Sequence, residues 1–201
     1  MKGSELTISK GIFGLESNFK ERFFRNYKKI KHLVGHFRGL GCKIVLTQGT
    51  YDMVHIGHAR YLEEAKRQGD FLIVGVDSDK KVRRRKGLDR PVVPEGERLE
   101  MLTHLRCVDV VFMKELGDPK WNLIRTVRPD VLVATKETYS PSQIKELRKY
   151  CGKVVILEPQ ATTSTSAKIR RLQIGTAQKI GKALTPKLIQ TIEHVLAEIR
   201  G

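Results

Sequence analysis

The chain has 201 residues, of which 40% are hydrophobic, and a formal net charge of +16. This length supports one medium-sized domain with appendages, and no stretch is long and apolar enough to suggest a membrane span. The N-terminus lacks a secretory pattern, and three widely spaced cysteines argue against a disulfide framework, so we expect a cytoplasmic protein. The positive charge suits a polyanion such as a nucleoside triphosphate, and equally a nucleic acid or an acidic membrane surface.

Residues 1–40 carry amphipathic, basic helix patterns. Apolar side chains recur among lysines and arginines at Phe19, Phe23, Phe24, Tyr27, Ile30 and Val34. Such a stripe is typical of an appended helix that packs on a core. We therefore interpret residues 1–40 as a basic helical N-terminal extension.

Residues 41–172 alternate strand-like apolar runs with segments of helix length. The runs are Ile44–Leu46, Phe71–Val76, Val108–Phe112, Val131–Val133 and Val154–Leu157. They predict an α/β domain with a Rossmann-like, doubly wound, five-stranded parallel sheet. In residues 173–201, Thr185-Pro186 predicts a helix start and an amphipathic stripe follows, so we expect a C-terminal helical extension.

Residues 47–58, hereafter the βα corner, predict a phosphate-binding site. A strand that ends in a tight turn and opens a helix aims backbone N–H groups at one point, where an anion is stabilised. His55 and His58 lie three positions apart in the first turn of that helix, so both rings share one face. The other candidate nucleotide-binding residues of the corner are Thr47, Gly49, Thr50, Tyr51 and Gly57.

Two histidines at this spacing could instead form half of a metal site, or be ordinary polar residues at a helix end. Zinc usually takes three or four protein ligands, and the other histidines and the cysteines form no cluster with ligand spacing. We therefore predict no protein metal site. The combination of strand, turn, histidine pair and helix favours a catalytic role for His55 and His58.

The second predicted strand is followed by acidic residues and then by a basic run at residues 83–86. Such a run is usually a solvated surface. On a loop beside the βα corner, however, it would supply cations to a triphosphate or to a phosphorylated acceptor. Arg85 and Lys86 from this run, and Arg98 from the next predicted helix, are candidate phosphate or substrate ligands.

Five consecutive hydroxyl residues, 162–166, follow the last predicted strand. One hydroxyl would cap the next helix, and a run of five exceeds that need. Hydroxyls and free N–H groups there would hold the β- and γ-phosphates that leave as pyrophosphate. Ser164, Thr165 and Ser166 are therefore candidate nucleotide-binding residues, and Lys168 is a candidate phosphate cation.

The βα corner resembles the nucleotidyltransferase signature of the cytidylyltransferase-like superfamily, in which H-x-G-H follows a T-x-G-x-F-D turn. Tyr51 stands where phenylalanine is usual. Residues 86–94, with Arg98 and residues 108–111, look like the adenylyltransferase domain that activates glycero-manno-heptose 1-phosphate. Ser164 to Ser166, with Ile169, are similar to the family's S-T-T-x-x-I element. The resemblance spans about residues 43–172.

The motif His-Ile-Gly-His also looks like the nucleotide-binding signature of class I aminoacyl-tRNA synthetases, for which the chain is too short. Two stretches differ from the transferases. Residues 134–139 replace the Lys-Gly-Gly-Asp-Tyr-like turn of the heptose enzymes, and residues 160–163 replace the R-T-E-G of the cytidylyltransferases. The identities of the base and of the acceptor therefore stay open.

The resemblance implies transfer of a nucleotidyl group from a nucleoside triphosphate, with ATP favoured, to a phosphorylated small molecule such as a sugar 1-phosphate. Pyrophosphate is released, and Mg²⁺ is the expected cofactor because it bridges phosphates. A CTP-dependent enzyme acting on glycerol 3-phosphate, phosphoethanolamine or phosphocholine is an alternative. The basic charge motivates a second alternative, a non-catalytic nucleic-acid-binding module. The terminal apolar stripes also fit a homodimer.

Overall fold

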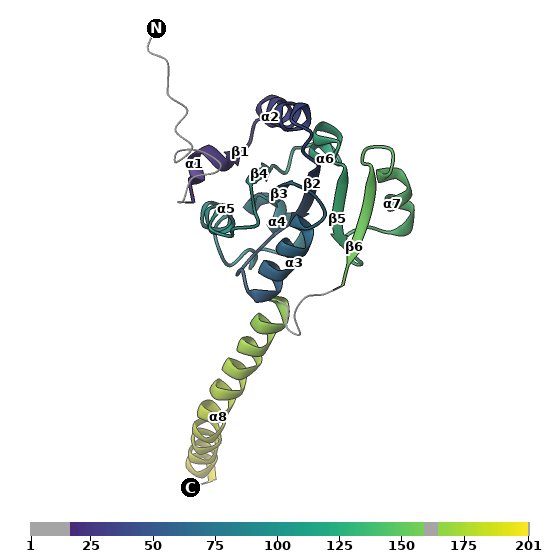
Figure 1. Cartoon of the computed structure of the whole chain (residues 1–201). Helices are drawn as coiled ribbons and strands as arrows, with labels where there is room; N and C mark the ends of the chain where they lie inside the picture. The colour runs from purple at the N-terminus through teal and green to yellow at the C-terminus, as the bar shows by residue number, and fades with distance from the viewer. Residues whose placement is uncertain (1–16, 159–164, 201) are drawn as a thin grey trace. The chain divides into compact units, whose positions relative to one another are not determined.

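A computed structural model of the chain describes residues 17–158 and 165–200. The chain divides into two compact units, residues 1–162 and 163–201. The first unit is an α/β domain, and the second contains one helix, α8 (Thr165–Arg200) (Figure 1). Within the described residues, no helix combines the length and the apolar character that a membrane crossing requires.

Among the described residues of the first unit, six parallel strands form the sheet, in the order β1-β4-β3-β2-β5-β6. They are β1 (Phe23–Phe24), β2 (Ile44–Gly49), β3 (Phe71–Asp77), β4 (Val110–Lys114), β5 (Val131–Thr135) and β6 (Lys153–Leu157). The predicted Rossmann-like parallel α/β fold is confirmed, with six strands in place of five. A two-residue strand such as β1 is too short to leave a periodic pattern in the sequence.

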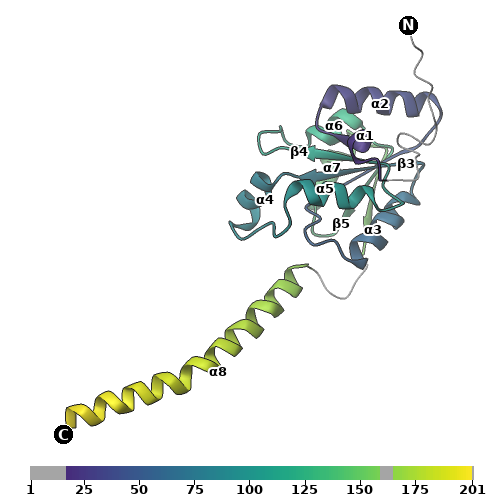
Figure 2. The same ribbon diagram turned by 90° about the vertical axis from the view of Figure 1, so that its left-hand side faces the viewer.

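Helices cover both faces of this sheet. They are α1 (Phe19–Arg22), α2 (Tyr27–Gly39), α3 (Ile56–Lys66), α4 (Asp79–Lys86), α5 (Glu95–Thr103), α6 (Asn122–Val127) and α7 (Pro141–Leu147). Figure 2 shows α2 and α6 on one side of the strands and α3 and α5 on the other.

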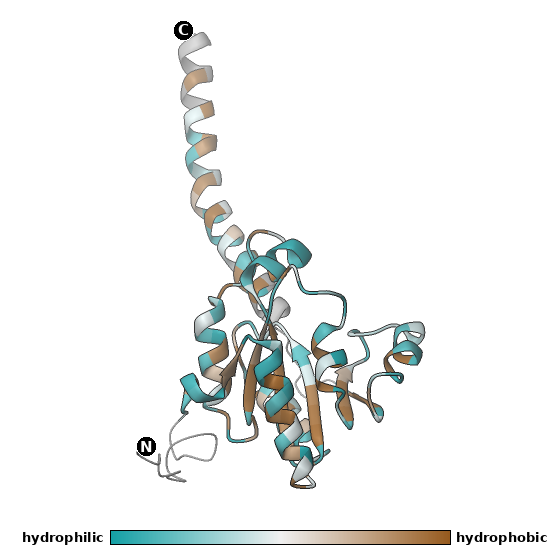
Figure 3. Cartoon of the chain, turned by 90° about the horizontal axis from the view of Figure 1, so that it is seen from above, coloured by the Kyte–Doolittle hydropathy of each residue, from teal (hydrophilic) through white to brown (hydrophobic). Residues whose placement is uncertain are grey.

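Alternation along each strand explains the two layers. Ile44 and Leu46 of β2 belong to the apolar cluster under α2 and α6, whereas Val45 between them belongs to the cluster under α3 and α5. Successive side chains of a strand point to opposite faces, so a strand that is apolar throughout must be covered on both. The hydropathy colouring of Figure 3 shows these apolar strands in the interior.

The order of the strands locates the binding edge. The chain runs from β2 to β3 and β4 on one side, and then returns to place β5 and β6 on the other side of β2. In open parallel sheets, ligands bind outside the carboxyl ends of the strands where the order reverses. The carboxyl end of β2 is therefore the expected ligand site, and the βα corner begins there.

The N-terminal segment is built into the sheet. β1 pairs with β4, and Ile30 and Val34 of α2 are buried in the core, which confirms that the stripe packs on the domain. The Arg22 guanidinium is buried, and it donates to the carbonyl oxygens of Thr103 (2.6 Å), Val108 and Asp109. Residues from β1 onward are thus part of the domain core.

Helix α8 runs without a break through Pro186, so the prediction of a helix start at Thr185-Pro186 is wrong. Proline suits the first turn of a helix, but the residues before it are helical as well. The expected domain boundary at 172/173 falls inside α8, whereas the compact units divide at 162/163.

Candidate functional site

The βα corner joins the end of β2 to the start of α3, and its two histidines cap that helix for each other. His55 is the N-cap residue, and its Nδ1 accepts a hydrogen bond from the backbone N–H of Gly57 at 3.1 Å. Nδ1 of His58 in turn accepts a hydrogen bond from the backbone N–H of His55 at 3.4 Å. The two ring centroids lie 4.1 Å apart, so the side chains are adjacent as the sequence predicted.

These caps fix the tautomer of both imidazoles. A neutral ring that accepts at Nδ1 carries its proton on Nε2, and that N–H is a donor. In each histidine, Nδ1 therefore caps the start of α3 and Nε2 carries the hydrogen-bond donor. A capped helix N-terminus with two such donors can stabilise an anion.

The turn before the histidines is shaped by Tyr51, whose ring is buried and packs edge-on against His58 at 5.6 Å. A Cβ atom at Gly49 would lie 2.9 Å from that ring, so the end of β2 needs glycine. Tyr51 itself adopts a left-handed backbone conformation, with φ of 53°. The structure places Tyr51, a candidate nucleotide ligand, in the core beneath the corner.

Thr47 and Thr50 take different positions. Thr47 is buried in β2 with its Oγ1 2.8 Å from the Tyr61 hydroxyl, which makes it a packing residue. Thr50 lies in the turn, and its Oγ1 accepts a hydrogen bond from Arg85 at 2.9 Å. Of these two candidates, only Thr50 connects the corner to the basic run.

Arg98, predicted as a phosphate cation, is 1% exposed and is held by protein groups instead. Its guanidinium donates to the carbonyl oxygens of Thr50, Asp77 (2.9 Å) and Val93 (2.9 Å), and to the Asp79 carboxylate. It ties the end of β2 to the end of β3, so its role in the structure is to position the corner.

Asp52 fixes the loop that follows α4. Its carboxylate accepts hydrogen bonds from the backbone N–H groups of Val92 and Val93 and from Arg90 Nε at 2.8 Å. Burial by itself would raise the pKa of Asp52, but these donors outweigh it and hold the pKa below its usual range. Asp52 was missed as a candidate, although the aspartate of the turn motif was visible in the sequence.

The basic run is helical rather than a loop, because it forms α4. Ser78 caps this helix, and Val82 anchors it in the core. Arg85 contacts the corner through Thr50, and Lys86 follows it as the last residue of α4. Partial burial and the neighbouring Arg85 and Arg90 lower the pKa of Lys86.

A cluster that the sequence did not reveal surrounds Asp77, the last residue of β3. Its carboxylate is 1% exposed and lies 3.0 Å from Lys114 Nζ, 3.0 Å from Arg85 NH2 and 3.9 Å from Lys81 Nζ. Burial alone would raise the pKa of Asp77, but Lys114 and Arg85 hold it below its usual range. Burial lowers the pKa of Lys114, and Asp77 offsets part of this.

These charged groups line a cavity of about 390 Å³, hereafter the strand-end cavity. Gln48, Gly49, Asp77 and Lys114 from the ends of β2, β3 and β4 contribute to it, and Arg85 reaches it from α4. Gly49 and Arg85 belong both to the cavity and to the surroundings of the βα corner. The two features therefore adjoin.

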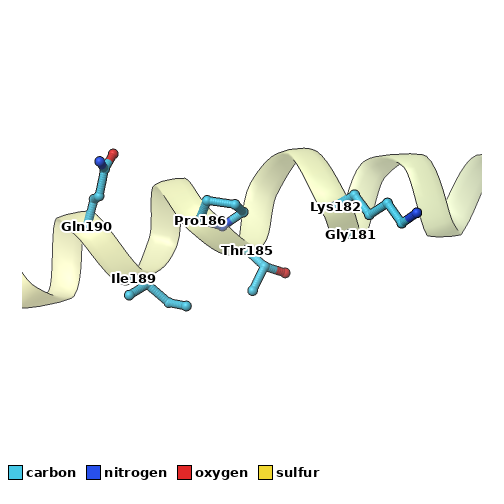
Figure 4. A pocket seen from close by; sticks show the side chains of 6 residues that line it. All are labelled: Gly181, Lys182, Thr185, Pro186, Ile189 and Gln190. Atoms are coloured by element: carbon cyan, nitrogen blue, oxygen red, sulfur yellow. The ribbon is translucent and has the colours of Figure 1, made fainter.

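A larger depression of about 670 Å³ lies on α8, lined by Gly181, Lys182, Thr185, Pro186, Ile189 and Gln190 (Figure 4). One helix alone forms it, and Lys182 is its single charged residue. In the strand-end cavity, by contrast, charged groups from several elements converge, so the cavity and the adjoining βα corner form the candidate site.

Four candidate residues cannot be placed. Ser164 lies outside the described residues, and Thr165, Ser166 and Lys168 are described only as part of the α8 backbone. Their predicted contacts with a triphosphate stay predictions.

Within residues 17–158 and 165–200, no three histidine, cysteine, aspartate or glutamate side chains gather as metal ligands. The carboxylates of Asp52 in the corner and Asp77 in the adjoining cavity are held by cations and backbone donors. A Mg²⁺ ion that enters with a triphosphate fits such a site, because Mg²⁺ coordinates mainly phosphate oxygens and water.

The family model described as "Cytidylyltransferase-like" matches residues 46–191. Among curated proteins, the chain is 37% identical over 155 residues to the bifunctional protein HldE of a Nitratiruptor species, covering 75% of this chain and 32% of that protein. It is 37% identical over 158 residues to the HldE protein of Geotalea uraniireducens, covering 77% and 32%. The chain thus spans about a third of the length of these relatives.

Among solved structures, a lipopolysaccharide core biosynthesis protein from Thermoplasma volcanium is similar, with a TM-score of 0.53 and 28% identity. The match covers 59% of this chain and 98% of that one. Pantoate-beta-alanine ligase from Francisella tularensis, in complex with beta-gamma ATP and beta-alanine, has a TM-score of 0.53 at 17% identity, covering 67% of this chain and 66% of that one. That likeness concerns the fold alone.

Proposed function

Because the chain belongs to the cytidylyltransferase-like family, we propose that it transfers a nucleotidyl group from a nucleoside triphosphate, with ATP favoured, to a phosphorylated small molecule such as a sugar 1-phosphate. The observation that carries this proposal is the reciprocal capping of His55 and His58 at the N-terminus of α3, in which each ring accepts at Nδ1 and so carries its proton on Nε2. The similarity to the HldE proteins supports a sugar phosphate as the acceptor.

The reaction needs positioning and charge neutralisation rather than a covalent nucleophile. An oxygen of the acceptor's phosphate forms a bond to the α-phosphorus. The bond from that phosphorus to the oxygen bridging the α- and β-phosphates breaks, and its electron pair leaves with pyrophosphate. Nε2–H of His55 and of His58 would donate to phosphate oxygens whose negative charge grows in the transition state.

Mg²⁺ would supply further charge neutralisation when bound with the triphosphate. Arg85 and Lys86, at the end of α4, would add positive charge beside the phosphates. Ser164, Thr165 and Ser166 are proposed to receive the leaving pyrophosphate. The cytoplasmic location and the homodimer expected from the sequence stay predictions.

The test is pyrophosphate release from the protein incubated with Mg²⁺, each of the four triphosphates and a panel of phosphomonoesters. His55→Asn and His58→Asn are the informative variants, because asparagine can keep the cap through its side-chain oxygen but has no group at the Nε2 position. We expect each to lower turnover by about a hundredfold or more. His32→Ala, an exposed histidine of α2, is the matched control.

Unchanged turnover in both asparagine variants would overturn the proposal. Release that requires CTP and glycerol 3-phosphate, phosphoethanolamine or phosphocholine would replace it with the cytidylyltransferase alternative. Salt-sensitive binding to DNA or RNA without any pyrophosphate release would favour the nucleic-acid-binding alternative.

A further inference from the structure

The strand-end cavity carries more positive charge than its own acidic groups require. Around the buried Asp77 carboxylate lie Lys114, Arg85 and Lys81, all within 4 Å. One carboxylate neutralises one of these three cations, so a surplus of positive charge remains. Arg85, whose side chain is 55% exposed, is accessible to a ligand from solvent. Such a surplus is stabilised by an anion with two charges, such as a phosphomonoester.

The side chain of Lys114 occupies space that is open because residue 75 is a glycine. A Cβ atom at Gly75, on the neighbouring strand β3, would lie 3.0 Å from Lys114 Cδ and 2.7 Å from Leu123 Cδ2. Because Gly75 has no side chain, the aliphatic stem of Lys114 lies across β3 and its ammonium group reaches Asp77. The cation is therefore a buried part of the fold, and its side chain is only 16% exposed.

Apart from Lys120, the remaining lining of the cavity is uncharged or acidic, and it combines aromatic rings with hydrogen-bonding groups. The Tyr27 hydroxyl donates to Asp118 Oδ2 at 2.6 Å, and the same oxygen accepts from the backbone N–H of Glu115. The Gln48 amide donates to the Tyr139 hydroxyl at 3.2 Å. Groups of this kind can pair with ligand hydroxyls, which both donate and accept.

Tyr27 brings the N-terminal segment into this lining. It is the first residue of α2, and its ring packs against Phe112 of β4 with centroids 4.7 Å apart. The hydrogen bond to Asp118 then holds the loop after β4 at the cavity. A segment that the sequence suggested was an appendage thus shapes the strand-end cavity.

We propose that the strand-end cavity is the acceptor subsite and that it selects a phosphorylated polyol, with the phosphate on Lys114 and Arg85 and the hydroxyls on the Asp118 and Gln48 side. This inference rests on the function proposed above. Arg85 links the acceptor subsite to the triphosphate site, because it contacts both Asp77 in the cavity and Thr50 in the βα corner. The acceptor's phosphate on Arg85 then lies next to the triphosphate.

The same charges argue against an amine-bearing acceptor. Lys81, Arg85, Lys114 and Lys120 line the cavity with Asp77 and Asp118 as its acidic residues, so cations outnumber carboxylates by two. An ammonium group such as that of phosphoethanolamine would enter a site of its own sign. A neutral polyol avoids this repulsion.

Lys114→Met tests the phosphate end, because methionine keeps an unbranched stem and removes the charge. We expect the acceptor KM and the dissociation constant of a sugar 1-phosphate, measured by calorimetry, to rise by about tenfold or more. The dissociation constant of a non-hydrolysable ATP analogue should stay within about twofold of the unmodified protein. Lys145→Met, an exposed lysine of α7, is the control and should change neither constant.

Tyr27→Phe tests the polyol end and serves as the second variant if Lys114→Met does not fold. It should weaken binding of hexose and heptose 1-phosphates severalfold while leaving binding of inorganic phosphate unchanged. Equal weakening of both ligands, or of neither, would overturn the assignment of the polyol end.

Three further outcomes would overturn the acceptor subsite. They are an unchanged acceptor constant in folded Lys114→Met, phosphoethanolamine binding more tightly than any sugar phosphate, and no sugar phosphate binding at all. Calorimetry separates this inference from the proposed function. If sugar phosphate binding depends on Lys114 but no pyrophosphate is released, the proposed function is rejected and the subsite is kept. If pyrophosphate is released but the acceptor KM is unchanged in Lys114→Met, the proposed function is kept and the subsite is rejected.

Discussion

The two ends of the chain are both basic and amphipathic, yet the structure uses them differently. Residues 17–40 enter the α/β domain through a strand, a buried arginine and two core side chains of α2. On α8, by contrast, large apolar side chains are about half exposed, among them Leu172, Ile180, Leu184 and Leu188. An amphipathic stripe therefore predicts a helix, but it does not say what covers the stripe.

The largest expected difference between the two ends comes from Arg22. Arg22→Met removes a charged donor from three carbonyl groups, two of them in buried hydrogen bonds, and we expect it to lower the free energy of unfolding by about 4 kcal/mol. Urea unfolding followed by circular dichroism measures this loss. Arg25→Met is the control, since its ion pair with Glu115 is exposed and should contribute under about 1 kcal/mol. Equal losses in the two variants would show that the buried arginine does not anchor the segment.

Truncating one isoleucine at each end sharpens the comparison. Ile30→Ala leaves a cavity in the fully buried core under α2 and should cost about 3 kcal/mol. Ile180→Ala, on the exposed stripe of α8, should change the same free energy of unfolding by under about 0.5 kcal/mol. A large loss from Ile180→Ala in solution would mean that the α8 stripe is covered there.

Of the two ends, only the N-terminal segment contains a tyrosine, Tyr27, so a pH dependence from tyrosine titration distinguishes it from residues 163–201. Burial and the hydrogen bond to Asp118 raise the pKa of Tyr27 in the folded protein. A raised folded pKa gives stability that is present below the unfolded pKa of about 10 and is lost as pH rises toward the folded value. Tyr27→Phe should be about 1 kcal/mol less stable at pH 7, and this deficit should shrink above pH 10. Urea midpoints from pH 7 to 11 test it, and a deficit that grows with pH would contradict it.

The smallest expected effect on the domain is that of Pro186→Ala. Proline inside a helix lacks a donor for the backbone carbonyl one turn earlier, so alanine should raise the helical content of α8 in far-ultraviolet circular dichroism. The free energy of unfolding of the α/β domain should change by under about 0.5 kcal/mol. If that free energy changed by several kcal/mol, the two units would have to unfold together.

Much of the site was predictable because its signals are local. The strand, the turn and the paired histidines of the βα corner lie within 15 residues of sequence, and helix capping and side-chain periodicity act over that range. The resemblance drawn from these residues is confirmed by the family model. Arg98 shows the limit: its sequence position suggested a phosphate ligand, but its burial and its backbone partners make it a positioning residue.

The sequence alone determined the α/β fold class, the course of five strands and the adjacency of His55 and His58, since each depends on neighbours a few residues apart. Only the tertiary structure decided the sixth strand, the partners of Asp77 and the lining of the strand-end cavity. Asp77 and Lys114 are 37 residues apart and meet because β3 and β4 are parallel neighbours whose ends share one edge. The physical reason is that strand order brings distant residues together, and no local pattern encodes that order.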